Sequence, residues 1–158
     1  MTEALWQVVL GGILAVSGGF LQQEYSLRRN QARQKKLLTH LLSQVIQEVN
    51  RIIRKLIETY DKTSIVYVLY LTELSNARVS YDRNSDWAVL FDDDLRRGVF
   101  DYFAREQVTR SYLHVLISLV GKPEFPPDHV KSETVKQIAI FRELAVQGDG
   151  LVDKVKRA

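Results

Sequence analysis

The sequence contains no cysteine, and this absence excludes disulfide bonds, thiolate catalysis and cysteine-ligated metal sites. It also fits a reducing compartment. Proline is scarce, with three residues in 158, and an apolar content of 46% indicates a folded chain, not a disordered one. No glycine or proline lies between Phe20 and Gly98, so a long uninterrupted helix can form across this part of the chain. The length allows one domain beyond a short N-terminal segment.

Motifs that bind nucleotides or mark a catalytic nucleophile are absent as well. The chain has no G-x-x-x-x-G-K-[ST], no G-x-S-x-G and no G-x-G-x-x-G after a strand. His40 and His114 lie within helical patterns, where a structural role is the favoured interpretation. His129 and Glu133 are one helical turn apart, but zinc needs three or four ligands, and the Glu-x-x-His motif of di-iron bundles does not occur. We expect no cofactor, no metal and no catalysis; a small helical enzyme using carboxylates or His129 is an alternative.

Residues 4–21, ALWQVVLGGILAVSGGFL, form a run of 18 residues without a charge. A helix rises about 1.5 Å per residue, so this run would cover roughly 27 Å, close to the ~30 Å hydrocarbon core of a bilayer. Trp6 would lie at one interface. We predict a retained transmembrane anchor. A cleaved signal peptide is less favoured because Met-Thr-Glu supplies no positive charge before the run, and a buried apolar helix is the third interpretation.

Small residues recur along one face of this run. Gly11, Ala15 and Gly19 are spaced four apart, and such a stripe lets a second membrane helix approach closely. The stripe predicts self-association or docking on a partner's membrane helix. The alternative is that small residues are simply frequent in membrane spans.

Basic residues follow the uncharged run directly and are absent before it. The basic residues within residues 22–36 are Arg28, Arg29, Arg33, Lys35 and Lys36, against one acid, Glu24. Positive flanks stay on the cytoplasmic side and attract anionic headgroups at roughly 1 kcal/mol each. We therefore expect a single-pass protein of the cytoplasmic (inner) membrane with residues 1–3 outside, residues 22–36 as a juxtamembrane segment in contact with lipid, and residues 37–158 in the cytoplasm.

A net charge of +3 could indicate a nucleic-acid partner, but the distribution of the charge along the chain argues against one. Residues 1–36 hold five Lys or Arg and two acidic residues, whereas residues 37–158 hold seventeen of each. The whole excess thus belongs to the predicted membrane flank. A nucleic-acid-binding domain carries a basic patch on its folded part, so we expect no nucleic-acid partner.

The remainder of the chain predicts an all-α bundle of about four helices. A broad apolar face from residue 31 to about residue 60 indicates a long first bundle helix, continuous with the anchor, and is wider than the seam of an isolated coiled coil. A second helix is expected over residues 65–80, then a loop at 81–85 and a short apolar element at 87–91. Asp92, Asp93 and Asp94 favour a helix start by capping and by the helix dipole, and a metal site is the minor interpretation.

The third helix should run to about residue 120 and the fourth from Asp128 or Ser132 to the C-terminal region. Gly148 reads as a weak point through which the fourth helix continues, with a helix end at Gly148 as the alternative. The predicted buried stripe of the third helix comprises Phe100, Ala104, Val108, Tyr112, Val115 and Leu119, with Phe103 and Leu116 beside it. The predicted stripe of the fourth comprises Ile138, Phe141, Ala145, Val152 and Val155, with Gly148 on the same face. Tyrosine and phenylalanine side chains at these spacings are typical of core, with an aromatic ligand pocket between helices as the alternative.

These features together predict a membrane-anchored helical interaction or accessory protein without catalytic activity, which presents a bundle at the cytoplasmic membrane face. The layout looks like that of many small anchored helical proteins of bacteria, a likeness of architecture alone. The main alternative is an extracytoplasmic four-helix ligand-sensing domain. The basic flank argues against it, and so does the lack of a second span to carry a signal inward.

Overall fold

The computed structural model describes residues 2–83 and 91–158, with side chains described for residues 26–83 and 91–158. The described residues form four helices and no strand, so the all-α prediction is confirmed. The helices are α1 (Thr2–Thr63), α2 (Val68–Asp82), α3 (Asp93–Leu119) and α4 (Pro127–Arg157). The chain divides into two compact units, Met1–Leu38 and Thr39–Ala158, and α1 contributes to both.

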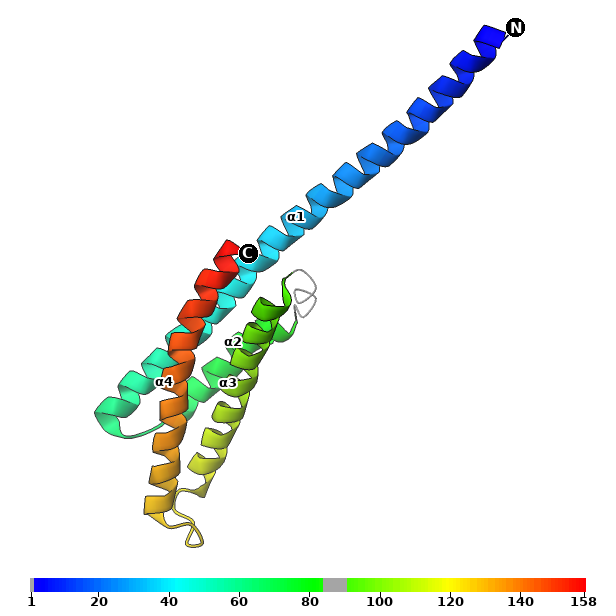
Figure 1. The fold of residues 1–158 in the computed structure, drawn as a ribbon. Helices are drawn as coiled ribbons and strands as arrows, with labels where there is room; N and C mark the ends of the chain where they lie inside the picture. The colour runs from blue at the N-terminus through cyan, green and yellow to red at the C-terminus, as the bar shows by residue number, and fades with distance from the viewer. Residues whose placement is uncertain (1, 84–90) are drawn as a thin grey trace. The chain divides into compact units, whose positions relative to one another are not determined.

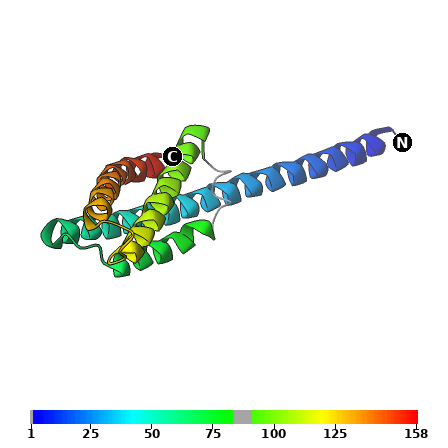
Figure 2. The ribbon, with the colours of Figure 1, turned by 90° about the horizontal axis from the view of Figure 1, so that it is seen from below.

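The unit Thr39–Ala158 contains the second part of α1 together with α2, α3 and α4. Within it, α3 and α4 run side by side in opposite directions (Figure 1). The second part of α1 has α4 along one side and α2 along the other (Figure 2). Hydrogen bonds agree with this arrangement, since Asn50 of α1 reaches Ala145 of α4, and Thr59 of α1 lies 3.2 Å from the Tyr70 hydroxyl of α2. The four-helix bundle predicted from the sequence is therefore confirmed.

The core of this unit comes from one apolar face of each helix. All of the predicted inner positions of α4 are buried. On α1 the predicted apolar positions Leu42, Ile46, Val49, Ile52, Ile53 and Leu56 are buried, whereas Leu38, Val45, Ile57 and Tyr60 are half-buried and Leu41 is exposed. The most deeply buried large side chains are Ile46, Ile52, Ile53 and Leu56 of α1, Leu71 and Leu74 of α2, Tyr102, Phe103 and Leu113 of α3, and Ile138, Phe141 and Leu144 of α4. The periodicity of the first and last bundle helices thus predicted their inner faces well.

Local chemistry explains where the helices begin and end. Asp92 is the N-cap of α3, because its carboxylate accepts a hydrogen bond from the Leu95 amide at 2.8 Å, which confirms the start predicted there. Ser64, with φ of 56°, ends α1, and Gly121, with φ of 81°, turns the chain after α3. α4 begins at Pro127, one residue before the first predicted start, and continues through Gly148 as expected.

Two sequence predictions for the middle of the chain need adjustment. α2 begins at Val68 and ends at Asp82, so residues 65–67 lie outside the helix predicted there. The short element predicted over residues 87–91 lies outside the described residues, apart from Phe91, whose side chain is buried.

The buried stripe predicted for α3 is wrong at most of its positions, although Phe103 and Leu116, which were predicted beside it, are buried. Phe100 is 68% exposed, Val108 70% and Val115 51%, whereas the buried face carries Val99, Tyr102, Phe103, Leu113 and Leu116. The error has a physical cause, because this inner face also holds two polar side chains, Glu106 and Thr109. A search for regularly spaced apolar residues passes over a face that contains polar residues. It selects the neighbouring face of α3, whose apolar series is uninterrupted but points to solvent.

Candidate functional site

The three residues predicted to pack in the membrane, Gly11, Ala15 and Gly19, lie outside the residues whose side chains the structure describes. The side chains of the whole predicted anchor, residues 4–21, are likewise outside the described residues, and the backbone of this segment belongs to α1. Among the residues with described side chains, no helix is apolar over a sufficient length to cross a membrane.

The predicted lipid-contacting residues are on the first part of α1. Arg28, Arg29, Arg33 and Lys36 are exposed, and Lys35 is half-buried. This degree of exposure is what a headgroup-binding segment requires, because each cation has to reach water or lipid phosphate.

The candidate residues for metal binding or acid–base chemistry lie at the surface and are not grouped together. His40, His114 and His129 are all exposed, so the structural role expected for the first two is not a role in the core. Glu133 accepts a hydrogen bond from Lys136 at 2.6 Å, and the lysine lowers the pKa of that carboxyl. Within the part of the chain that the structure describes, no three His, Asp or Glu side chains are grouped closely enough to hold a metal ion.

A buried polar layer connects α1, α3 and α4 at Asn50, whose side chain is 4% exposed. The Asn50 amide nitrogen donates to the Ala145 carbonyl and to the Asp149 carboxylate, both at 3.0 Å, and the Tyr102 hydroxyl donates to the Asn50 carbonyl oxygen at 2.7 Å. Arg54 closes the layer with an ion pair to Asp149 at the surface. Burial raises the pKa of Tyr102, so its phenol stays a donor. The layer fixes the register of three helices at one level.

Gly148 is the position that lets this layer form. A Cβ atom built there would lie 2.5 Å from the Asn50 side-chain nitrogen and 2.6 Å from its Cγ, closer than real Cβ contacts. α4 therefore presents bare backbone to Asn50, and the amide of Asn50 occupies the space of the missing side chain. Gly150, two residues further along, has nothing within 4 Å of its equivalent Cβ position.

A second buried polar group, Glu106 of α3, lies against α2 and is fully buried. Its Oε1 accepts a hydrogen bond from Arg110 Nε at 2.8 Å, and its Oε2 lies 3.8 Å from a terminal nitrogen of Arg78. Arg78 also donates to the Phe103 carbonyl at 2.9 Å and pairs with Asp82. Both arginine side chains are less than a fifth exposed, so the cluster is an ionic clamp between α2 and α3.

Burial and pairing act on Glu106 in opposite directions. Burial raises the pKa of this carboxyl above its ordinary value, and the guanidiniums of Arg110 and Arg78 partly offset the increase. Oε2 is buried without a hydrogen-bond partner among the described residues, which adds to the cost of the charged form. Burial therefore destabilises the charged form of the Glu106 carboxyl. Among the described residues, Arg110 and Arg78 supply the positive charge that compensates it.

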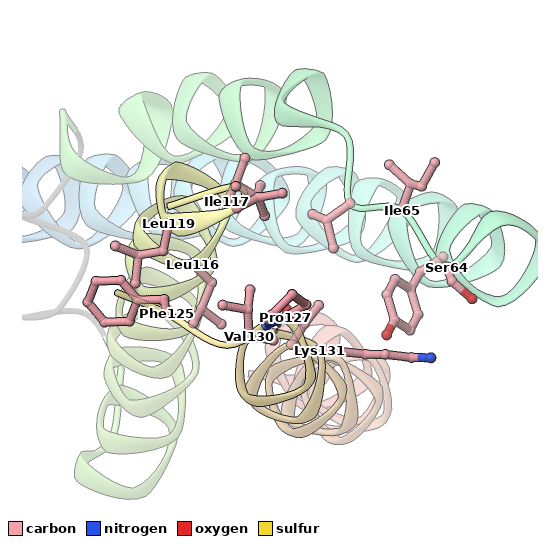
Figure 3. A pocket seen from close by; sticks show the side chains of 14 residues that line it. Ser64, Ile65, Leu116, Ile117, Leu119, Phe125, Pro127, Val130 and Lys131 are labelled. Atoms are coloured by element: carbon pink, nitrogen blue, oxygen red, sulfur yellow. Dashed lines mark hydrogen bonds between the residues drawn. The ribbon is translucent and has the colours of Figure 1, made fainter. Parts of the chain in front are cut away.

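A cavity of about 600 Å³ opens at the end of the unit where α1 terminates. Its walls come from the α1–α2 connection, the C-terminal end of α3, the loop after it and the first turns of α4. In Figure 3, Ser64 and Ile65 lie on one side of the cavity, and Leu116, Phe125 and Val130 lie on the other. The lining is mainly apolar, with few polar side chains, among them Tyr60, Lys131 and Thr134. This is the composition of a small-molecule pocket.

The sequence predicted neither the polar layer nor the clamp as sites, and it offered an aromatic pocket between helices only as the alternative to plain core. Of the tyrosines that this alternative included, Tyr60 lines the cavity, whereas the ring of Tyr81 stacks on that of Phe103 with their centroids 3.9 Å apart and Tyr102 is buried in the core. Of the two residues at the centre of the polar layer, the sequence pattern placed Gly148 on an inner face, whereas it placed Asn50 on the solvent-facing side of the first bundle helix. The prediction for Asn50 is wrong, because its side chain is 4% exposed. No protein-family model, curated protein or solved structure matches this chain.

Proposed function

We propose that this chain is a single-pass membrane protein that presents its helical unit at the cytoplasmic face and works there as a non-catalytic interaction or accessory subunit. The observation that carries the proposal is the junction of 18 uncharged residues, 4–21, with five cations and one acid in residues 22–36. An apolar run of this length prefers the bilayer core, and a basic flank keeps its own side cytoplasmic. The exposure of Arg28, Arg29, Arg33 and Lys36 supports the second part.

An outward-facing apolar strip on α3 supports an interaction role for the helical unit. It consists of Phe100, Val108, Tyr112 and Val115, which share one side of the helix at steps of three, four or eight residues and are each more than 40% exposed. Single exposed apolar residues are normal, but an aligned series of large side chains is typical of a surface that another protein covers.

Association through the membrane helix is the part of the proposal that mutation can test most sharply. Replacing Gly11 and Gly19 with leucine would block close helix approach, so we expect the cross-linked dimer or partner adduct of the full chain in native membranes to fall about fivefold or more. A matched control replaces Ile13 and Ser17 with leucine, because at about 100° per residue these positions lie on the opposite side of the same helix, and it should leave cross-linking within about twofold. Equal losses in both variants, or none in either, would contradict a role for this face.

A further inference from the structure

The cavity beside Ser64 is lined by apolar side chains that remain partly exposed to solvent. Ile65, Val120 and Phe125, which line it, are all more than a third exposed, although they belong to residue types that prefer burial. They surround a volume of about 600 Å³, which lies within the range of small-molecule pockets. An apolar ligand tail would remove these side chains from water, and its binding would gain about 0.8 kcal/mol for each buried CH₂, roughly a fourfold change in affinity.

The charge beside the cavity is positive and free. Lys131 lines the cavity, extends along its edge in Figure 3, and has no ion-pair partner among the described residues. The hydroxyls of Tyr60 and Thr134 also belong to the lining, and Thr134 already donates to the Val130 carbonyl. The Lys131 ammonium and the Tyr60 hydroxyl together supply one positive charge and one further hydrogen-bond donor. A ligand group with a single negative charge and two acceptor oxygens would match them.

One acid near Lys131 limits how much negative charge the ligand can carry. Asp128 lies one turn before Lys131 on α4, on the same side of the helix. Its carboxylate would repel a dianionic phosphate more strongly than a monoanion. The pocket therefore favours an anion of charge −1.

We infer that this cavity binds a free single-chain monocarboxylate, with its alkyl tail among Ile65, Leu116 and Phe125 and its carboxylate at Lys131. The ligand enters from solution at the end of the helical unit where α1 ends. This binding site is independent of the membrane anchor, so it goes beyond the proposed function and does not rest on it.

Photolabelling of the full chain in phosphatidylcholine nanodiscs tests the site. The probe is dodecanoate with a diazirine near its methyl end, and labelled peptides are located by mass spectrometry. We expect saturable labelling within residues 116–134, competed by dodecanoate at least tenfold better than by dodecyltrimethylammonium, because the carboxylate accepts a charge-assisted hydrogen bond worth about tenfold or more. Dodecanoate should also compete better than dodecyl phosphate, because the acid beside Lys131 repels the larger negative charge. Nonanoate, three CH₂ groups shorter, should compete about sixtyfold less well.

Two variants and one control separate the ammonium from the apolar walls. Lys131→Glu should reduce labelling at least tenfold, and Ile65→Trp, at a side chain 54% exposed, should reduce it by narrowing the cavity without disturbing the core. Lys154→Glu makes the same charge change on an exposed turn near the other end of α4 and should stay within about twofold of the parent. Labelling confined to residues 1–38, undiminished labelling of Lys131→Glu, or stronger competition by dodecyl phosphate would overturn the assignment.

Discussion

Replacing Gly148 with alanine should destabilise the helical unit by about 3 kcal/mol, although alanine is the better helix former by about 1 kcal/mol. The new methyl group would occupy the place of the Asn50 amide, whose nitrogen it would approach to 2.5 Å. Asn50 would have to move, leaving the Tyr102 hydroxyl without the acceptor that Asn50 provides. Overpacking costs about 1–3 kcal/mol and each buried unsatisfied group about 1–3 kcal/mol.

Urea unfolding of the full chain in mild detergent, followed by circular dichroism, measures this effect. Gly150→Ala is the matched control, because it makes the same change on the same helix where nothing lies within 4 Å, and it should stabilise the unit by about 0.5–1 kcal/mol. In the double variant Asn50→Ala with Gly148→Ala, the clash is absent, so the two single losses should sum to clearly more than the double loss. Simple additivity would mean that the glycine does not accommodate Asn50.

Replacing Glu106 with alanine should also cost about 3 kcal/mol. The substitution leaves the guanidiniums of Arg78 and Arg110, 16% and 17% exposed, close together without their shared carboxylate. Breaking a buried ion pair from one side typically costs 3–5 kcal/mol, and partial access of water to both arginines places this case at the lower end. The control Glu143→Ala removes an ion pair to Arg105 at the surface and should cost less than about 1 kcal/mol.

The charge of Glu106 can be separated from its shape by Glu106→Gln, measured as a function of pH. Because burial raises the folded pKa of this carboxyl, the folded chain holds its proton more tightly than the unfolded chain does. The stability that this group contributes is full below its ordinary pKa of 4.5 and is lost as pH rises through the raised value. The parent should therefore lose stability relative to Glu106→Gln from about pH 4.5 upward. A relative gain over that window would contradict the dominance of burial.

Sequence periodicity predicted the helices better than it predicted their inner faces. α4 buries apolar side chains and Gly148, so its core could be read directly, whereas α1 buries Ser43 and Asn50 beside its apolar stripe. α3 buries Glu106 and Thr109, and these two residues conceal the true face from any count of apolar positions. The charge of Glu106 is compensated by Arg78 and Arg110. Arg78 is on another helix, and a contact between helices has no signature in local spacing.

The candidate sites were harder to predict from the sequence than the helices, because they are formed by tertiary contacts. Gly148 reads in sequence as a weak point or a helix end, because the reason for its small size is Asn50, 98 residues earlier in the chain. The cavity near Ser64 is assembled from the ends of four segments, none of which carries a motif. By contrast, the predicted anchor and its basic flank are contiguous in sequence, so charge and length alone sufficed to propose them.

Protease protection of a tag placed after Ala158, in sealed and carbonate-washed membrane vesicles of known orientation, tests the central proposal most directly. The intact chain should remain with the washed membranes, because residues 4–21 would lie in the hydrocarbon core. Its tag should be digested in inside-out vesicles and protected in right-side-out vesicles. A tag released into the carbonate supernatant would contradict the anchor, and digestion in right-side-out vesicles alone would replace the cytoplasmic placement with the extracytoplasmic sensor.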